Sequence, residues 1–149
     1  MADKAKIEKS LQGMNVDLEM QILIVVSVLT TLKFAPTLVD KELLTNICRA
    51  FFTLGHLYMI YIFLYTNYRL TKSKSRTAEE KSISKAACFK VFRGILVSGV
   101  ISAAVHIYSG MLPPMVIPVF MGFISLIGND FFYQVLYTQF PSLFEFLYR

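Results

Sequence analysis

Two long apolar segments on either side of a strongly basic connector constrain this chain more than any other feature. The apolar segments cover residues 47–68 and 91–112, and each is long enough to cross a hydrocarbon core of about 30 Å. Residues 69–93 hold eight of the fifteen Lys and Arg residues, against two acidic residues. Basic loops beside membrane spans stay on the cytoplasmic side, so the pattern predicts an integral membrane protein with a cytosolic basic surface. The candidate basic contact surface consists of Arg69, Lys72, Lys74, Arg76, Lys81, Lys85, Lys90 and Arg93.

The composition supports the same class of protein. Hydrophobic residues make up 55% of the 149 residues, and the mean hydropathy is +0.54. A soluble domain of this length could not hide so much apolar surface, whereas lipid solvates it directly. The net charge of +5 favours anionic partners, either lipid headgroups or RNA, and nothing in the pattern indicates DNA binding. We therefore expect one all-α membrane domain covering residues 1–149.

Local signals divide this domain into helices. Pro36 ends the first apolar run, Asp40 can cap the second helix, and Pro113 stops the third. Thr77 and Glu80 form the S/T-x-x-E capping box typical of a helix start. The predicted segments are helix 1 at 15–35, helix 2 at 41–70, the basic connector at 71–77, helix 3 with a cytosolic extension at 78–112, a short helix at 115–128 and an aromatic interfacial tail at 129–149.

Two of the apolar runs are short for a membrane span. Residues 20–32 cover about 20 Å, so this helix spans only if the bilayer thins or Gln21 and Lys33 snorkel. The run at 115–128 predicts a re-entrant or interfacial helix. We therefore expect three membrane-embedded helices plus this short fourth helix, with the side of the N-terminus left open. Residues 1–13 fit either an amphipathic surface helix or a frayed tail.

Polar side chains recur at helical spacing on the second and third helices. Intramembrane polar groups usually face protein or water, so the two stripes predict facing walls of a hydrated groove. In the alternative, Arg49 snorkels near the luminal interface while Thr53 and His56 bond to neighbouring helices. The candidate polar groove consists of Asn46, Arg49, Thr53, His56, Ser98, Ser102 and His106. The other face of the second helix is predicted to meet lipid through Phe51, Leu54, Tyr58, Tyr61, Ile62 and Tyr65.

The sequence contains no catalytic pattern. His56 and His106 have no second ligand at i+3 or i+4 and no nearby cysteine or carboxylate, which disfavours a metal site. No Gly-rich phosphate loop, nucleophile elbow or paired acid motif occurs. Cys48 and Cys88 lie near opposite ends of a predicted hairpin, so we expect two buried thiols and no disulfide. The sequence predicts no enzyme, no cofactor and no metal.

Several local features follow one another over residues 15–137. They are a short polar-flanked run after Asn15, an arginine at the start of the second span (Arg49), the basic connector, the His106, Ile107 and Tyr108 element with its downstream proline, a short helix entered at Pro118, and Asn129. This order resembles the inorganic phosphate transport protein 88 family, also described as component three of the SRP-independent targeting pathway. Here the connector is shorter, the run at 115–128 is more apolar, and an aromatic end replaces the family's polar tail.

The resemblance implies a protein of the endoplasmic reticulum membrane that delivers or inserts client membrane proteins near the Sec61 translocon and the ribosome. Short apolar runs could thin the bilayer, and a polar groove would lower the barrier for a client's hydrophilic segment. The alternative from another class is a structural accessory subunit of a large membrane complex, such as a respiratory complex of the mitochondrial inner membrane. The basic connector fits simple positive-inside asymmetry, anionic lipid binding or contact with ribosomal RNA.

Overall fold

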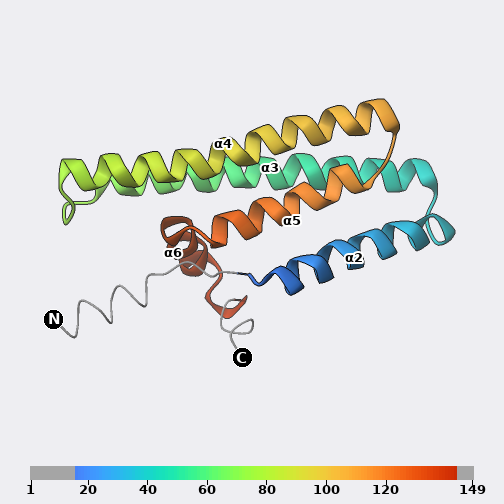
Figure 1. The fold of residues 1–149 in the computed structure, drawn as a ribbon, viewed down its shortest axis with the longest axis horizontal. Coiled ribbons are helices and arrows are strands. Elements are labelled where there is room, and N and C mark those ends of the chain that lie inside the picture. Colours follow the sequence, from blue (N-terminus) through green and yellow to red (C-terminus); the bar gives the residue numbers. More distant parts are fainter. Residues whose placement is uncertain (1–15, 144–149) are drawn as a thin grey trace.

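The described part of the chain is built from helices (Figure 1). The computed structural model describes residues 16–143, and this range contains no β-strand, which confirms the predicted all-α fold. The surface helix or frayed tail expected within residues 1–13 lies outside the described residues, as do residues 144–149 of the expected tail. The elements are α2 (Leu18–Phe34), the 3-10 helix η1 (Ala35–Thr37), α3 (Lys41–Lys72), α4 (Ala78–Ser109), α5 (Pro113–Ile127) and α6 (Asp130–Gln139).

Helices α3 and α4 form an antiparallel hairpin that frames the fold (Figure 1). Each has 32 residues and is about 48 Å long. The predicted capping box starts α4, because the Thr77 hydroxyl accepts from the Glu80 N–H and the Glu80 carboxylate accepts from the Thr77 N–H. The helix ends at Ser109 rather than at 112, since Gly110 has φ 69° and adopts the left-handed conformation that terminates helices.

The connector end of the hairpin is closed by hydrogen bonds between the two helices and the loop. Helix α3 continues to Lys72 rather than ending at 70. The predicted cytosolic extension of the third helix, at the start of α4, lies against this end of α3. The Lys81 ammonium donates to the Thr71 carbonyl over 3.3 Å, and the Arg76 guanidinium donates to the Ser84 hydroxyl over 3.4 Å. The end of α3, the connector and the start of α4 are thus held together, and we call this end of the hairpin the basic hairpin tip.

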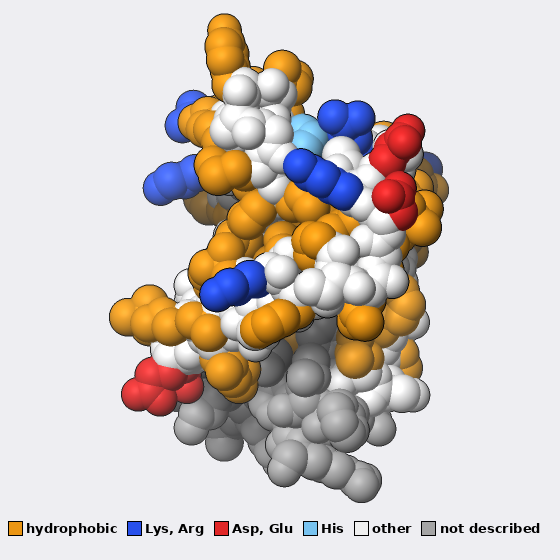
Figure 2. Space-filling view, turned by 90° about the vertical axis from the view of Figure 1, so that its right-hand side faces the viewer, with side chains coloured by type: hydrophobic (Ala, Val, Ile, Leu, Met, Phe, Trp, Pro, Cys, Tyr) orange, Lys and Arg blue, Asp and Glu red, His pale blue; other side chains and the backbone are white. Residues whose placement is uncertain are grey.

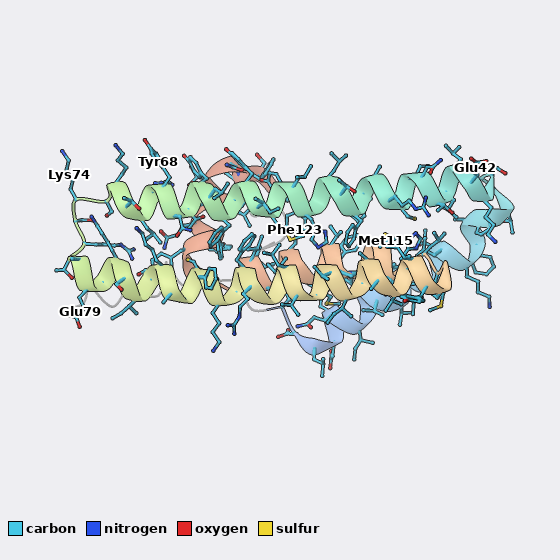
Figure 3. All side chains as sticks on the ribbon, turned by 90° about the horizontal axis from the view of Figure 1, so that it is seen from above. Glu42, Tyr68, Lys74, Glu79, Met115 and Phe123 are labelled. Carbon is cyan, nitrogen blue, oxygen red and sulfur yellow. The ribbon has the colours of Figure 1, made fainter. Side chains whose placement is uncertain are left out.

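Helix α5 packs into the hairpin rather than on its surface. It contacts both α3 and α4, and Met115 and Phe123 lie between these helices when seen from above (Figure 3). Its buried residues include Met115 and Val119, so the short helix is part of the bundle. Helices α5 and α6 meet at 105°, a geometry typical of a broken span or a re-entrant loop.

Helix α6 corrects the prediction of an aromatic tail along the interface. The Asn129 side chain caps it by accepting from the N–H groups of Phe131 and Phe132 at 3.0 and 3.4 Å. Burial of Phe132 and Leu136 attaches the helix to the core formed by α3, α4 and α5. Phe132 and Tyr133 are thus core residues of the bundle, and the half-buried Phe131 packs against them.

The surface of the bundle is largely apolar. Three segments are long and apolar enough to cross a membrane: Leu18–Thr37, Lys41–Lys72 and Ala78–Ser109. Helix α2 contains no buried residue and packs mainly on α5. On α3, the predicted lipid-facing set is wrong at Ile62, which is fully buried in the core, and at Tyr58, which is half-buried beside α5 and α6. Phe51, Leu54, Tyr61 and Tyr65 are exposed as predicted.

The two ends of the hairpin differ in polarity. Lys74 and Glu79 mark the connector end in Figure 3, and Glu42 marks the opposite end. At that opposite end, hydrophobic side chains cover much of the surface, and Lys, Arg, Asp and Glu side chains lie among them and at the rim (Figure 2). Leu38 and Tyr108 are 85% and 93% exposed there. The connector end thus has the larger excess of Lys and Arg, while the opposite end exposes charges of both signs among apolar side chains, and such an asymmetry is expected of a chain oriented in a bilayer.

Candidate functional site

Arg49 and His106 join α3 to the turn between α4 and α5. His106 is buried, and its Nδ1 lies 2.7 Å from the Met111 carbonyl oxygen, so Nδ1 must carry the hydrogen. Its Nε2 then holds a lone pair and accepts from the Arg49 Nε–H over 3.1 Å. The imidazole is therefore neutral, and this pair fixes the end of the bundle opposite the connector.

His56 forms a second contact between the two helices. Its Nδ1 lies 2.8 Å from the Phe52 carbonyl oxygen and donates to it by the same reasoning. The buried Nε2 has no partner among the described residues, and a Cβ built on Gly99 would lie 2.7 Å from it. His56 lies about 22 Å along α3, near the middle of the helix. A polar acceptor without a partner among the described residues thus lies near the middle of α3, against the backbone of Gly99.

The structure does not bring all members of the predicted polar groove to one site. Two of its contacts, Arg49–His106 and His56–Gly99, lie between α3 and α4, whereas the hydrogen bond of His56 to Phe52 stays within α3. Asn46 and Thr53 are exposed on α3. The remaining members of the predicted set, Ser98 and Ser102, lie on a flank of α4 that borders shallow hollows.

A lateral crevice between α4 and α5 contains Ser98. Its volume is about 560 Å³, and its lining combines apolar side chains with four polar ones. A neighbouring hollow of about 310 Å³ shares part of this lining and is bordered by Gln21 of α2. Figure 1 shows α5 lying between α2 and α4, so α5 forms the floor between these two helices. We call this feature the lateral crevice; its polar residues are Gln21, Lys90, Ser98, Ser125 and Asn129.

The lateral crevice can offer hydrogen bonds to a segment lying in it. The Ser125 hydroxyl donates to the Met121 carbonyl and keeps its lone pairs free, while the Asn129 amide keeps its N–H groups because its oxygen caps α6. Sequence reasoning found Ser98 and missed Gln21, Ser125 and Asn129. No helical spacing related Ser125 to Asn129, because α5 ends at Ile127 and Asn129 is the N-cap of α6.

Six members of the predicted basic contact surface lie at the connector end of the hairpin, whereas Lys90 and Arg93 lie about 18 and 22 Å along α4 from its start. Five of its members are exposed, and Arg76, Lys81 and Lys85 are half-buried. The Arg76 guanidinium lies 4.6 Å from the centre of the Phe131 ring, which ties the connector to α6 through a cation–π contact. The exposed members are Arg69, Lys72, Lys74, Lys90 and Arg93.

The described residues hold no group of three or more His, Cys, Asp or Glu side chains that could bind a metal ion. Cys48 and Cys88 are both buried and unpaired with each other, as predicted.

Comparisons with family models, with characterised proteins and with solved structures give no match. The fold alone defines the class: an all-α protein with three helices long and apolar enough to cross a membrane, plus a bent pair of shorter helices. The lateral crevice and the basic hairpin tip are the two surface features of the described residues from which a function can be argued.

Proposed function

We propose that this chain is a non-enzymatic membrane protein that assists the targeting or insertion of client proteins at the endoplasmic reticulum, in or near a Sec61 translocon. The lateral crevice is the observation that carries the proposal. It lies beside α2, a helix without a buried residue, and offers polar groups along α4, which is long and apolar enough to span. A hydrophilic client segment in contact with these groups would avoid part of the cost of entering hydrocarbon.

Two other features support the proposal. Helix α5 is about 22 Å long, shorter than a bilayer core, which favours local thinning beside the crevice. The basic hairpin tip would face the cytosol, where the ribosome presents a phosphate-rich surface. The resemblance in the order of sequence features adds the expected location at the endoplasmic reticulum.

The test fills the lateral crevice without disturbing the bundle. Gly94 lines the crevice, and a Cβ added there meets nothing within 4 Å. The Gly94→Leu variant is expected to reduce insertion of client membrane proteins into microsomes severalfold, with an unchanged melting temperature. Ala104→Leu is the matched control, because Ala104 is exposed on the same helix outside the described hollows. Normal insertion by a folded Gly94→Leu variant contradicts the proposal.

A second variant asks whether the α3–α4 contacts carry the activity instead. Replacement of Arg49 and His56 by leucine together removes polar groups that do not line the crevice. Loss of insertion in this variant, combined with normal insertion by Gly94→Leu, would move the site to the contacts between α3 and α4.

The accessory-subunit alternative makes a different prediction about location. Helix α2 exposes several large apolar side chains, including Leu18 and Leu23 at 70% and 58%, which a neighbouring subunit could cover. Recovery of the chain with ribosome-bound translocons supports insertion. Recovery with a complex of the mitochondrial inner membrane supports the accessory subunit and excludes the proposed function.

A further inference from the structure

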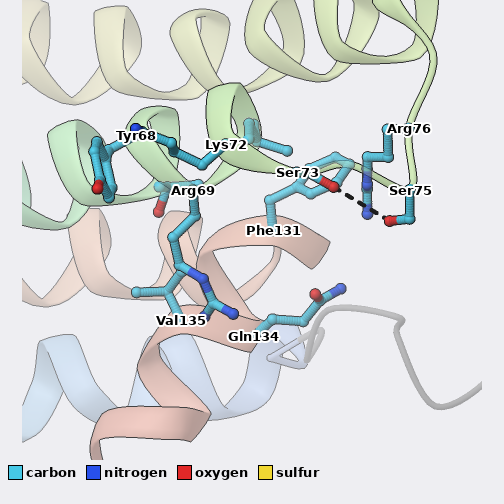
Figure 4. Close-up of a pocket in the computed structure, with 11 residues that line it drawn as sticks. Tyr68, Arg69, Lys72, Ser73, Ser75, Arg76, Phe131, Gln134 and Val135 are labelled. Carbon is cyan, nitrogen blue, oxygen red and sulfur yellow. Dashed lines mark hydrogen bonds between the residues drawn. The ribbon is translucent and has the colours of Figure 1, made fainter.

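A second hollow lies at the connector end, where the end of α3, the connector and the start of α6 meet (Figure 4). Its volume is about 490 Å³. Three cationic side chains line it, Arg69, Lys72 and Arg76, and none of the described lining residues is acidic. This concentration of positive charge in a concave site favours an anionic ligand.

The two arginines approach the hollow from different elements. Arg69 extends from α3 toward Val135 and Gln134 of α6 (Figure 4). Arg76 comes from the connector and is held over the Phe131 ring at 4.6 Å. A guanidinium carries five N–H donors in a fixed plane, and the structure uses one of those of Arg76 in its bond to a serine hydroxyl. The remaining donors are available to the oxygens of a ligand.

Thr66 supplies an independent indication of a ligand. The residue is 2% exposed and is one of those that line the hollow, and its buried hydroxyl has no hydrogen-bond partner among the described residues. A buried hydroxyl is costly when it makes no hydrogen bond, and most such groups in native proteins are paired. An acceptor oxygen bound in the hollow would satisfy it.

We propose that this hollow binds the phosphate group of an anionic lipid headgroup. Guanidinium, ammonium and hydroxyl donors together match the oxygens of a phosphate. The hollow lies at the basic end of an apolar helix long enough to span, which is the level of the headgroups. Its lining also contains Tyr68, Leu70 and Val135, which suit the glycerol and upper acyl region of a lipid better than an RNA backbone.

The test uses the full chain in mild detergent and measures the melting temperature with added short-chain phosphatidic acid. Phosphatidylcholine of the same chain length, inorganic phosphate and a short RNA duplex serve as the other ligands. Phosphatidic acid is expected to raise the melting temperature and to bind more tightly than phosphatidylcholine. Arg69→Gln should weaken its binding about tenfold or more, as expected for loss of a hydrogen bond to a charged group.

Two variants separate a built site from general attraction to positive charge. Lys74→Gln removes the same charge from an exposed connector position outside the hollow, and should leave binding within about twofold. Thr66→Val keeps the side-chain shape and removes the unpartnered hydroxyl. It should fold at least as stably as the parent without lipid and lose much of the lipid-induced shift.

Equal weakening by Lys74→Gln and Arg69→Gln, or an unchanged lipid shift in Thr66→Val, overturns the site. If RNA raises the melting temperature in a way that depends on Arg69 and Thr66, and lipid does not raise it, the assignment of the hollow to a lipid is overturned. Equal protection by inorganic phosphate supports the phosphate site and assigns it to the free ion. This hollow shares no lining residue with the lateral crevice. A normal lipid-induced rise in melting temperature in Gly94→Leu would therefore show that the lipid site can be tested independently of the proposed function.

Discussion

At the scale of single residues, three glycines set how closely the helices pack. A Cβ on Gly55 would lie 2.6 Å from Val119, and a Cβ on Gly122 would lie 2.6 Å from the Met59 sulfur. These reciprocal contacts allow α5 to approach α3, as small residues do in membrane helix pairs. At the third glycine, Gly99, the ring of His56 occupies the space that a Cβ would need. Each of these positions is constrained by a neighbouring side chain rather than by its own backbone.

The contact between His56 and Gly99 predicts a specific effect of one methyl group. Gly99→Ala forces the imidazole to move and should destabilise the chain by about 1–3 kcal/mol, as overpacking does. Thermal unfolding in detergent measures it. Combining Gly99→Ala with His56→Ala should recover most of the loss, because the smaller side chain vacates the space.

Gly94→Ala is the matched control on the same helix. Nothing lies within 4 Å of its added Cβ, so this variant should be neutral or more stable by up to about 1 kcal/mol through helix propensity. Equal effects of the two alanine substitutions would contradict the close contact between α3 and α4 at Gly99.

His106 predicts an asymmetry within its hydrogen-bonded pair. His106→Leu removes both the acceptor for Arg49 and the donor to the Met111 carbonyl, while Arg49→Met removes one bond. Interhelical hydrogen bonds in membrane proteins contribute about 0.6 kcal/mol on average and up to about 1.7 kcal/mol. His106→Leu should therefore lower the melting temperature more than Arg49→Met, and a double-mutant cycle should give a coupling in this range. A larger decrease in melting temperature in Arg49→Met than in His106→Leu would contradict the assignment of two hydrogen bonds to His106.

At the scale of elements, α6 depends on its cap. The Asn129 side chain accepts from two backbone N–H groups at the start of the helix, so Asn129→Ala should cost about 1 kcal/mol and loosen α6. Hydrogen exchange of the amides at 131–136 would report this loosening. Thr138→Ala is the control, because its hydroxyl is exposed and bonds only within the same helix. Faster exchange in both variants would show that the cap is not what holds α6.

Helix limits were predictable where short-range chemistry decides them. The capping box at Thr77 is a local signal and starts α4 as predicted. Gly110 is also a local stop signal, but the prediction rested on Pro113 alone and therefore placed the helix end at 112 rather than at Ser109. The structure of α6 was missed for a different reason: its aromatic residues match both an interfacial belt and a buried helix face, and only packing against α3 and α5 distinguishes the two.

The candidate site was predictable in its residue types and not in its arrangement. The spacing correctly placed Arg49 and His56 on one flank of α3, and the structure pairs that flank with α4. The position of α5 could not be read from the sequence, because a run too short to cross a bilayer gives no indication of which helices it will pack between. The lateral crevice depends on that placement, since α5 supplies Ser125 and forms its floor.

At the scale of the whole molecule, the hairpin separates two environments. Its connector end collects Lys and Arg side chains, and its other end exposes Leu38 and Tyr108. Helix α2 and η1 lie between that end and the middle of the bundle, along α5, and contain no buried residue. An element held so loosely against the bundle can move relative to α4 at little cost in packing, which would change the width of the lateral crevice that it borders.

The charge asymmetry predicts the orientation of the chain. Ser75 in the connector and Thr37 before α3 are both exposed, and they lie at opposite ends of a helix long enough to span. In sealed vesicles with the cytosolic face outward, Ser75→Cys should react with a membrane-impermeant maleimide at once, because basic loops stay cytosolic. Thr37→Cys should react only after the membrane is permeabilised. The parent chain is the internal control, since Cys48 and Cys88 are buried and should react only after unfolding. Immediate labelling of Thr37→Cys with protection of Ser75→Cys would show the opposite orientation of the chain. The basic hairpin tip would then lie on the side of the membrane away from the ribosome.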